Sequence, residues 1–250
     1  MFRGGIARLG SLALAMVFIG LPLQGMLAHF SPWWLLLSSV LGLWTMRLVR
    51  KIMVTMATSG LARGDAKRAR RLYWVLWATA WGPVRLGCAL SLAACDAADE
   101  AYEKCLSRLD AIKVLDSEES LQAVALNLRA YCLARLGRHL EEAYTLAHKC
   151  MQLRNQVQGF QHTRGLTLLE LGRYEEATID LEAAWSGGKG TAFFESERCF
   201  DLGRLWELQG QGEYAVDYHA RASRAYPEGR WAKKARLLVK TSPSLDAFGI

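Results

Sequence analysis

Small residues recur at matching intervals in two segments near the C-terminal end of the chain. The two sets of matching positions are Leu168, Gly172, Ala177, Leu181 and Ala184, and then Trp206, Gly210, Ala215, His219 and Ala222. Each segment also has a glycine about two helical turns before its turn glycine, at Gly165 and Gly203. Antiparallel helices approach closely only where the facing side chains are small, and the turn between them needs a residue that tolerates positive φ. The spacing therefore predicts two helical hairpins built on one template.

This pattern resembles the tetratricopeptide repeat (TPR), a helix–turn–helix unit with a period of about 34 residues. The residues that carry the resemblance in the last unit are Leu202, Gly203, Trp206, Gly210, Ala215, Ala222 and Pro227. The unit before it has Gly165, Leu168, Gly172 and the run 174–177, and an earlier one has Gly137 followed by Ala143. The turn glycines at 137, 172 and 210 lie roughly 35 and 38 residues apart, close to the family period.

Upstream of these units the pattern is weaker. Residues 85–115 keep the helical period without a turn glycine, and Gly64-Asp65 followed by Ala69 is a faint echo of the same turn. The resemblance implies an all-α fold in which a TPR-like solenoid covers 98–240 and ends in a polar-faced capping helix over 228–240. Residues 50–97 are predicted to form basic and aromatic helices of divergent, repeat-like character, and 241–250 a tail.

The N-terminal part of the chain is apolar. Residues 9–28 carry no charge and are about as long as the 20 residues that cross a hydrocarbon core, and 33–49 form a second apolar stretch interrupted only by Arg47. Arg3 and Arg8 precede the first stretch, while Arg50 and Lys51 follow the second. Since basic residues favour the cytoplasmic side, we predict a transmembrane helical hairpin over 9–49. Its short N-tail (1–8) and the repeat domain would both face the cytoplasm, from the cytoplasmic membrane.

A cleaved secretory signal that ends near Ala28 is the alternative interpretation of the first stretch. It would leave one membrane span and could reverse the topology. The length of the apolar run and the basic residues after the second stretch favour the hairpin.

The net charge of +7 comes from 31 basic and 24 acidic residues, and the basic excess is confined to the N-terminal third. The rest of the chain is slightly acidic, which argues against a nucleic-acid partner. None of the six cysteines forms a Cys-x-x-Cys pair. We predict buried free thiols in a reducing compartment, with structural disulfides as the alternative.

A basic and aromatic segment lies between the apolar part and the repeats. Its basic residues are Lys67, Arg68, Arg70 and Arg71, and its tryptophans are Trp74, Trp77 and Trp81. Spacings of three and four place the tryptophans on one helical face. We favour a helix packed through these rings on its neighbour, ended by Gly82-Pro83. The alternative is a helix against the bilayer, with its cations near anionic headgroups.

No catalytic, metal-binding or phosphate-binding motif stands out in the sequence, and we predict a protein without enzymatic activity or cofactor. In the TPR family, partners bind in a groove lined by the first helix of each repeat. The resemblance therefore implies another protein as partner. Candidate groove residues are Asn127, Arg129, Arg135, Arg164 and Arg204. A solvated helix face is an equally good interpretation of each.

These observations predict a membrane-anchored scaffold that presents a TPR groove on the cytoplasmic side and does no chemistry. The alternative is a subunit of a membrane enzyme or transport complex, with its working site among the apolar helices of residues 9–81. That site would need polar groups at bilayer depth, and the sequence offers few of them.

Overall fold

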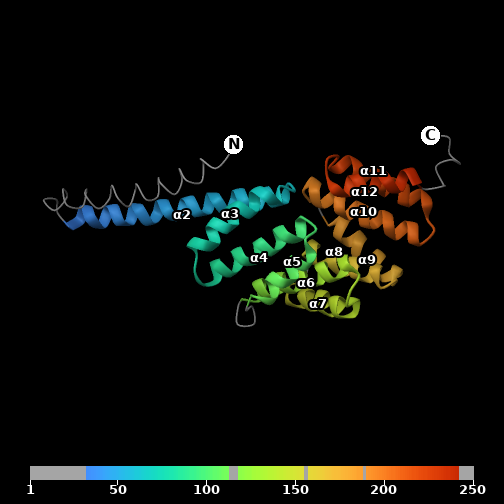
Figure 1. The fold of residues 1–250 in the computed structure, drawn as a ribbon, viewed down its shortest axis with the longest axis horizontal. Helices are drawn as coiled ribbons and strands as arrows, with labels where there is room; N and C mark the ends of the chain where they lie inside the picture. The colour runs from blue at the N-terminus through green and yellow to red at the C-terminus, as the bar shows by residue number, and fades with distance from the viewer. Residues whose placement is uncertain (1–31, 113–117, 155–156, 188–189, 242–250) are drawn as a thin grey trace. The chain divides into compact units, whose positions relative to one another are not determined.

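The computed structural model describes residues 32–112, 118–154, 157–187 and 190–241, and the regular structure within these ranges is helical throughout (Figure 1). The chain divides into two units, 1–52 and 53–250, and the boundary falls inside the first described helix. The helices are α2 (Pro32–Ala62), α3 (Ala66–Thr79), α4 (Gly82–Ala98), α5 (Tyr102–Asp110), α6 (Glu119–Leu136), α7 (Leu140–Leu153), α8 (Gln158–Glu170), α9 (Tyr174–Ser186), α10 (Ala192–Leu208), α11 (Gly212–Ala225) and α12 (Arg230–Thr241).

The described part of the first unit is the N-terminal portion of α2. Its large apolar side chains are solvent-exposed, among them Trp33, Leu41 and Trp44. Among the described residues, no helix combines the length and the apolar character that crossing a membrane requires. The uncharged part of α2 ends before Arg47, after about 15 residues or 22 Å, whereas a hydrocarbon core is about 30 Å thick. The predicted second span over 33–49 is therefore not supported. The predicted first span, 9–28, lies outside the described residues.

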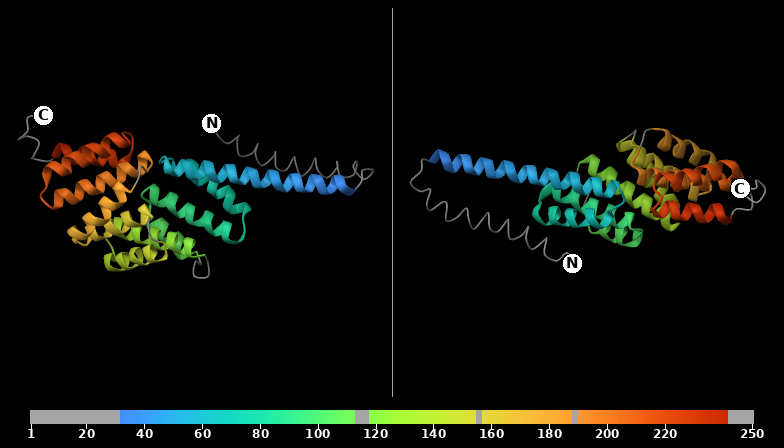
Figure 2. Two further views of the ribbon diagram at one scale, coloured as in Figure 1. Left: turned by 180° about the vertical axis from the view of Figure 1, so that it is seen from behind. Right: turned by 90° about the horizontal axis from the view of Figure 1, so that it is seen from above.

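The second unit is a series of helical hairpins, and each hairpin turns at a residue in the left-handed region. These residues, with their φ angles, are Gly64 (80°), Glu100 (60°), Gly137 (65°), Gly172 (75°) and Gly210 (72°). The α6–α7 turn has a second such residue, His139 (48°). The turns join α2 to α3, α4 to α5, α6 to α7, α8 to α9 and α10 to α11. Successive turn residues are roughly 35 to 38 positions apart, so one repeat period runs through the unit. Figure 2 shows the hairpins following one another along the chain.

One hydrogen bond recurs in every turn. The amide after the left-handed residue donates to the carbonyl five residues earlier, as from Arg173 to Leu168 at 2.9 Å and from Gln211 to Trp206 at 2.8 Å. Ala101 makes the same bond to Asp96, also at 2.9 Å. This is the Schellman arrangement that satisfies carbonyls at a helix end. The unit that lacks a turn glycine thus has the same turn as the others, with a glutamate in the position that glycine takes elsewhere.

Small residues let the two helices of a hairpin touch. A Cβ atom added to Gly165 would lie 2.8 Å from Leu181 Cγ, and one added to Gly203 would lie 2.5 Å from the ring of His219. The alanines of the pattern on α9 and α11 are buried. Neighbouring hairpins also pack on one another, since α6 contacts α8 as well as α7. The predicted all-α solenoid of small-residue hairpins is confirmed for this unit.

All six cysteines are buried and free, as predicted. Burial raises the pKa of the Cys95 thiol to about 12, so it stays protonated near neutral pH. These side chains behave as small apolar core residues.

We predict that Gly165→Ala lowers the free energy of unfolding by about 1–3 kcal/mol, because the new methyl group overlaps Leu181 in a close-packed hairpin. Gly159→Ala, in the same helix, is the control, since nothing lies within 4 Å of a Cβ there. The control variant should be as stable as the wild type or slightly more so. Urea unfolding followed by circular dichroism measures both. Equal stability of the two variants would contradict close packing at Gly165.

Candidate functional site

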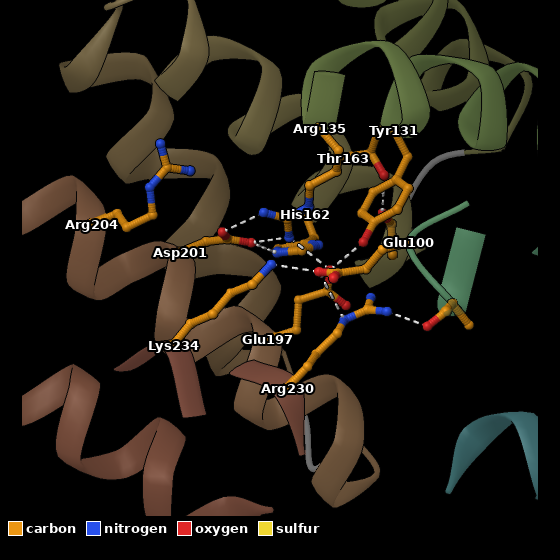
Figure 3. A network of polar contacts seen from close by, with 12 residues as sticks. Glu100, Tyr131, Arg135, His162, Thr163, Glu197, Asp201, Arg204, Arg230 and Lys234 are labelled. Carbon is orange, nitrogen blue, oxygen red and sulfur yellow. Dashed lines mark hydrogen bonds and ion pairs between the residues drawn. The ribbon is translucent and has the colours of Figure 1, made fainter. Parts of the chain in front are cut away.

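A buried network of charged side chains joins three first helices of successive hairpins (Figure 3). Arg135 of α6 donates through Nη1 to Asp201 Oδ1 at 2.8 Å and through Nη2 to Asp201 Oδ2 at 2.6 Å. Its Nη2 also donates to Glu197 Oε1 at 2.7 Å. His162 of α8 lies with Nε2 2.9 Å from Asp201 Oδ2, and the hydroxyl of Tyr131 donates to Glu197 Oε1 at 2.5 Å. One arginine thus binds two carboxylates of α10, and His162 of α8 binds one of these carboxylates, that of Asp201.

The network holds its charges out of water. The side chains of Arg135 and Glu197 are each 6% exposed, and that of Asp201 is fully buried. Burial alone would raise the pKa of Asp201, but the charge of Arg135 and the hydrogen bond from His162 outweigh it and hold that pKa well below its usual range. Desolvation of Arg135 is likewise outweighed by Asp201, so the pKa of the guanidinium lies above its ordinary value. The pair is therefore ionised throughout the physiological range.

The last helix covers this network. The indole ring of Trp231, on α12, packs with its centroid 4.3 Å from Arg135 Cζ. Lys234 Nζ lies 2.5 Å from Oε1 of Glu100, which is 134 positions earlier in the α4–α5 turn. Arg230 donates to the carbonyl of Ala98. The first helices of the hairpins therefore meet α12 and the α4–α5 turn at one place, drawn in Figure 3.

Three buried N–H groups at this place have no acceptor within hydrogen-bond distance. They are Nε of Arg135, Nε of Arg230 and Nε1 of Trp231. Arg230 Nε lies 3.6 Å from Oε1 of Glu100, and both guanidinium groups pack against the Trp231 ring, with Arg230 Cζ 4.8 Å from its centroid. An unpaired buried donor costs about 1–3 kcal/mol, so this cluster is a local weakness of the buried network.

The predicted groove arginines are all paired with acidic residues of the protein itself. Arg164 binds Asp180 through two bonds of 2.6 Å, and Arg204 Nη1 donates to Glu170 Oε1 at 2.7 Å. Arg129 contacts Asp110 at 2.6 Å and Glu142 at 3.8 Å. Asn127 is half-buried, and its Oδ1 has no hydrogen-bond partner. The structure thus brings only Arg135 of this set into the network, and contact of the set with a partner stays a prediction.

The sequence interpretation missed Glu197, Asp201, His162 and Trp231. Two signals could have found the first pair. Glu197 and Asp201 are four positions apart in α10, and Tyr131 and Arg135 have the same spacing in α6, so each pair lies on one helical face. Acids on one first helix and a base on another, at this spacing, indicate a cross-repeat ion pair.

The basic and aromatic segment is only partly packed. Trp77 is half-buried against Arg85, whose Cζ lies 4.5 Å from its ring, but Trp74 and Trp81 are 59% and 81% exposed. The favoured interpretation, in which the three rings pack on a neighbour, is wrong for Trp74 and Trp81. Helix α3 ends at Thr79, so Trp81 lies beyond it and does not share its face.

The four basic residues of this segment also differ from one another. Arg70 turns inward, where its Nη2 lies 2.7 Å from Asp99 and 3.1 Å from Asp96. Its predicted lipid-facing role is therefore not favoured by its contacts, and the same holds for Trp77. Lys67, Arg68 and Arg71 are exposed.

A cavity of about 260 Å³ lies against the last hairpin and α12. Its lining includes Glu207, Ala215, His219 and Leu238. Both ring nitrogens of His219 are buried without a hydrogen-bond partner, and burial lowers its pKa. In the part of the chain that the structure describes, no group of three His, Cys, Asp or Glu side chains is placed to hold a metal ion.

Comparison with solved structures places this architecture among known folds. The protein TTC0263 of Thermus thermophilus, described as a thermophilic TPR protein, matches with a TM-score of 0.56 over 77% of this chain and 97% of its own, at 16% identity. This chain therefore has a TPR-like fold. MamA also matches, at 19% identity over 70% of this chain and 91% of its own, with a TM-score of 0.40. No protein-family model and no curated protein matches the sequence.

We predict that Arg135→Met lowers the stability of the TPR-like unit by about 3–5 kcal/mol, because two buried carboxylates lose their counter-charge. Adding Glu197→Gln and Asp201→Asn should recover part of the loss. Arg138→Met, which breaks the exposed pair with Glu103, is the matched control and should change stability little. Denaturant unfolding measures all variants. No recovery in the triple variant would contradict the buried-charge explanation.

His219→Phe should remove a pH dependence of stability. The pKa of His219 is lowered in the folded protein, so its contribution to stability is complete above the unfolded value near 6.5 and is lost as pH falls below it. Phenylalanine keeps the packing against Gly203 and binds no proton. The stability advantage of the variant over the wild type should therefore grow between about pH 7.5 and pH 5.5, as measured by thermal unfolding. A difference that is constant with pH would show that His219 titrates normally.

Proposed function

We propose that this protein is a non-catalytic scaffold that binds a segment of another protein along the first helices α6, α8 and α10, which we call the inner face. The single observation that carries the proposal is the TPR-like stack of hairpins, in which α8 contacts both α6 and α10. Stacked helical repeats present an extended surface of this kind to their partners.

The predicted groove residues fit this proposal by their places on the first helices. Arg204 lies on α10, three positions after Asp201, and Asn127 lies on α6, where its Oδ1 has no hydrogen-bond partner. The ion pairs of Arg129, Arg164 and Arg204 keep these side chains in defined positions. A partner with matching charges could bind without reordering them, which lowers the entropic cost of association.

Absence of catalysis is part of the proposal. His162 and Asp201 form the kind of pair that orients a general base in enzymes. Here Arg135 binds the carboxylate through two bonds, and His162 is only 6% exposed. His162 and Asp201 are therefore held within the buried network, where a substrate cannot reach them.

We also propose that residues 9–49 hold the scaffold at the cytoplasmic membrane, with the TPR-like unit on the cytoplasmic side. The support is the apolar sequence of 9–28, the basic residues on both flanks and the exposed apolar side chains of α2, such as Leu37, Val40 and Leu43. Exposed apolar side chains gathered on one segment are typical of an interaction surface.

The binding face can be tested with photoreactive side chains placed one at a time at Arg204 and at Asn127. We expect both to crosslink to the same partner, and excess unmodified protein to suppress the adduct. A photoreactive group at Ile179, 70% exposed on α9, is the control and should give no such adduct. Equal capture from Ile179 and from the inner positions would exclude the inner face as the binding site.

A further inference from the structure

A second surface of the TPR-like unit is unpartnered and lies on its first hairpin. We call it the basic–tryptophan surface, and its members are Lys67, Arg68, Arg71, Trp74 and Trp81. Positions 67, 71 and 74 are spaced by four and three, so these side chains share one face of α3. Trp81 and the 45% exposed Val84 follow the end of the helix, at the α3–α4 corner, where Trp81 is the N-cap residue of α4.

The core of this hairpin does not need these side chains. Ala66, Ala69, Tyr73 and Leu76 are the buried residues of α3, and they pack with Cys88, Leu92 and Cys95 of α4. The two indole rings of the surface are therefore left facing solvent. Burying an exposed large side chain against an apolar environment is favourable, so their exposure favours an external contact.

The charge of the surface has one sign. Helix α3 contains no acidic residue, and Asp65 before it is used as the N-cap, accepting from the amide of Arg68 at 3.0 Å. Lys67 and Arg68 lie in the first turn, where the helix dipole disfavours positive charge, and Arg71 lies one turn further along. Arg70, the one basic residue of the segment that pairs with acids, lies at the edge of this face and turns toward Asp96 and Asp99. The two cations of the first turn thus weaken the helix unless an anion outside it compensates them.

We infer that the basic–tryptophan surface docks on a bilayer that contains anionic lipids. Indole rings favour the headgroup region, and cations on the same helix add electrostatic attraction to anionic headgroups. The surface is an exposed helix face with cations beside an indole ring, which fits a charged lipid plane better than a shaped protein pocket. Its contact is separate from the inner face of the scaffold and from the apolar residues 9–49, so it gives the TPR-like unit its own attachment to lipid.

The test uses the full chain reconstituted in vesicles of phosphatidylglycerol and brominated phosphatidylcholine, which quenches tryptophans that reach the acyl chains. Five tryptophans would reach the lipid, namely Trp33, Trp34, Trp44, Trp74 and Trp81. If each contributes equally to the quenched fluorescence, Trp74→Phe with Trp81→Phe should remove about two-fifths of it. Trp185→Phe with Trp206→Phe is the matched control. These two half-buried rings belong to the later hairpins, and their loss should leave the quenched part unchanged.

The charge requirement is tested with Lys67→Gln, Arg68→Gln and Arg71→Gln together. At roughly fivefold per charge, docking should weaken about a hundredfold at low salt, so that Trp74 and Trp81 lose their quenching. Lys149→Gln, Arg224→Gln and Lys233→Gln remove three exposed charges elsewhere and should have no effect. Added salt should also weaken docking, because it screens the attraction between these cations and the anionic headgroups.

Two results would overturn the inference. If Trp74→Phe with Trp81→Phe leaves all of the quenching in place while substitution of Trp33, Trp34 and Trp44 removes it, residues 9–49 bind lipid and the basic–tryptophan surface does not. If added partner protein, rather than lipid, shields Trp74 and Trp81 from acrylamide, the surface binds protein. Either outcome leaves the inner-face binding proposal to its own test.

Discussion

Close approach of the two helices within each hairpin is the constraint on which the rest of the TPR-like unit depends. It requires small residues where the helices cross, as at Gly165 and Gly203, and a left-handed residue at the turn. Once both are present, the chain reverses with a saturated set of backbone hydrogen bonds, and the apolar side chains left over face the next hairpin. The repeat period follows from that geometry, since each hairpin must be long enough to cover its neighbour.

The network of Arg135, Glu197 and Asp201 specifies how the hairpins are arranged more than it stabilises them. A buried arginine with two carboxylates is weak as a source of stability, because desolvation of three charges offsets their attraction. Its geometry is specific, however. Two bonds from Arg135 to Asp201 and one to Glu197 form only when α6 and α10 stand at one distance and register. The network therefore selects one arrangement of hairpins that apolar packing alone would leave less well defined.

Glu100 shows how a repeat can be hidden in a sequence. A glutamate in the left-handed region is strained by about 1–2 kcal/mol relative to glycine. Its carboxylate lies 2.5 Å from Lys234 and 3.6 Å from Arg230 Nε, and these contacts with α12 offset part of the strain. This hairpin has no turn glycine to reveal it, and the glutamate at that position binds the last helix instead. No local sequence pattern predicts this contact, since Lys234 is 134 positions away from Glu100.

The sequence by itself determined the helical class, the hairpin template, the turns at Gly137, Gly172 and Gly210, and the burial of the cysteines, because these follow from local spacing and side-chain size. Only the tertiary structure decided which charges meet. It paired the predicted groove arginines with acids of the chain, gathered Arg135, His162 and Asp201 into one network, and turned Arg70 inward while Trp74 stayed exposed. Helical periodicity tells which side chains share a face. Which face meets another helix depends on packing between segments far apart in the sequence, and that is a property of the folded chain.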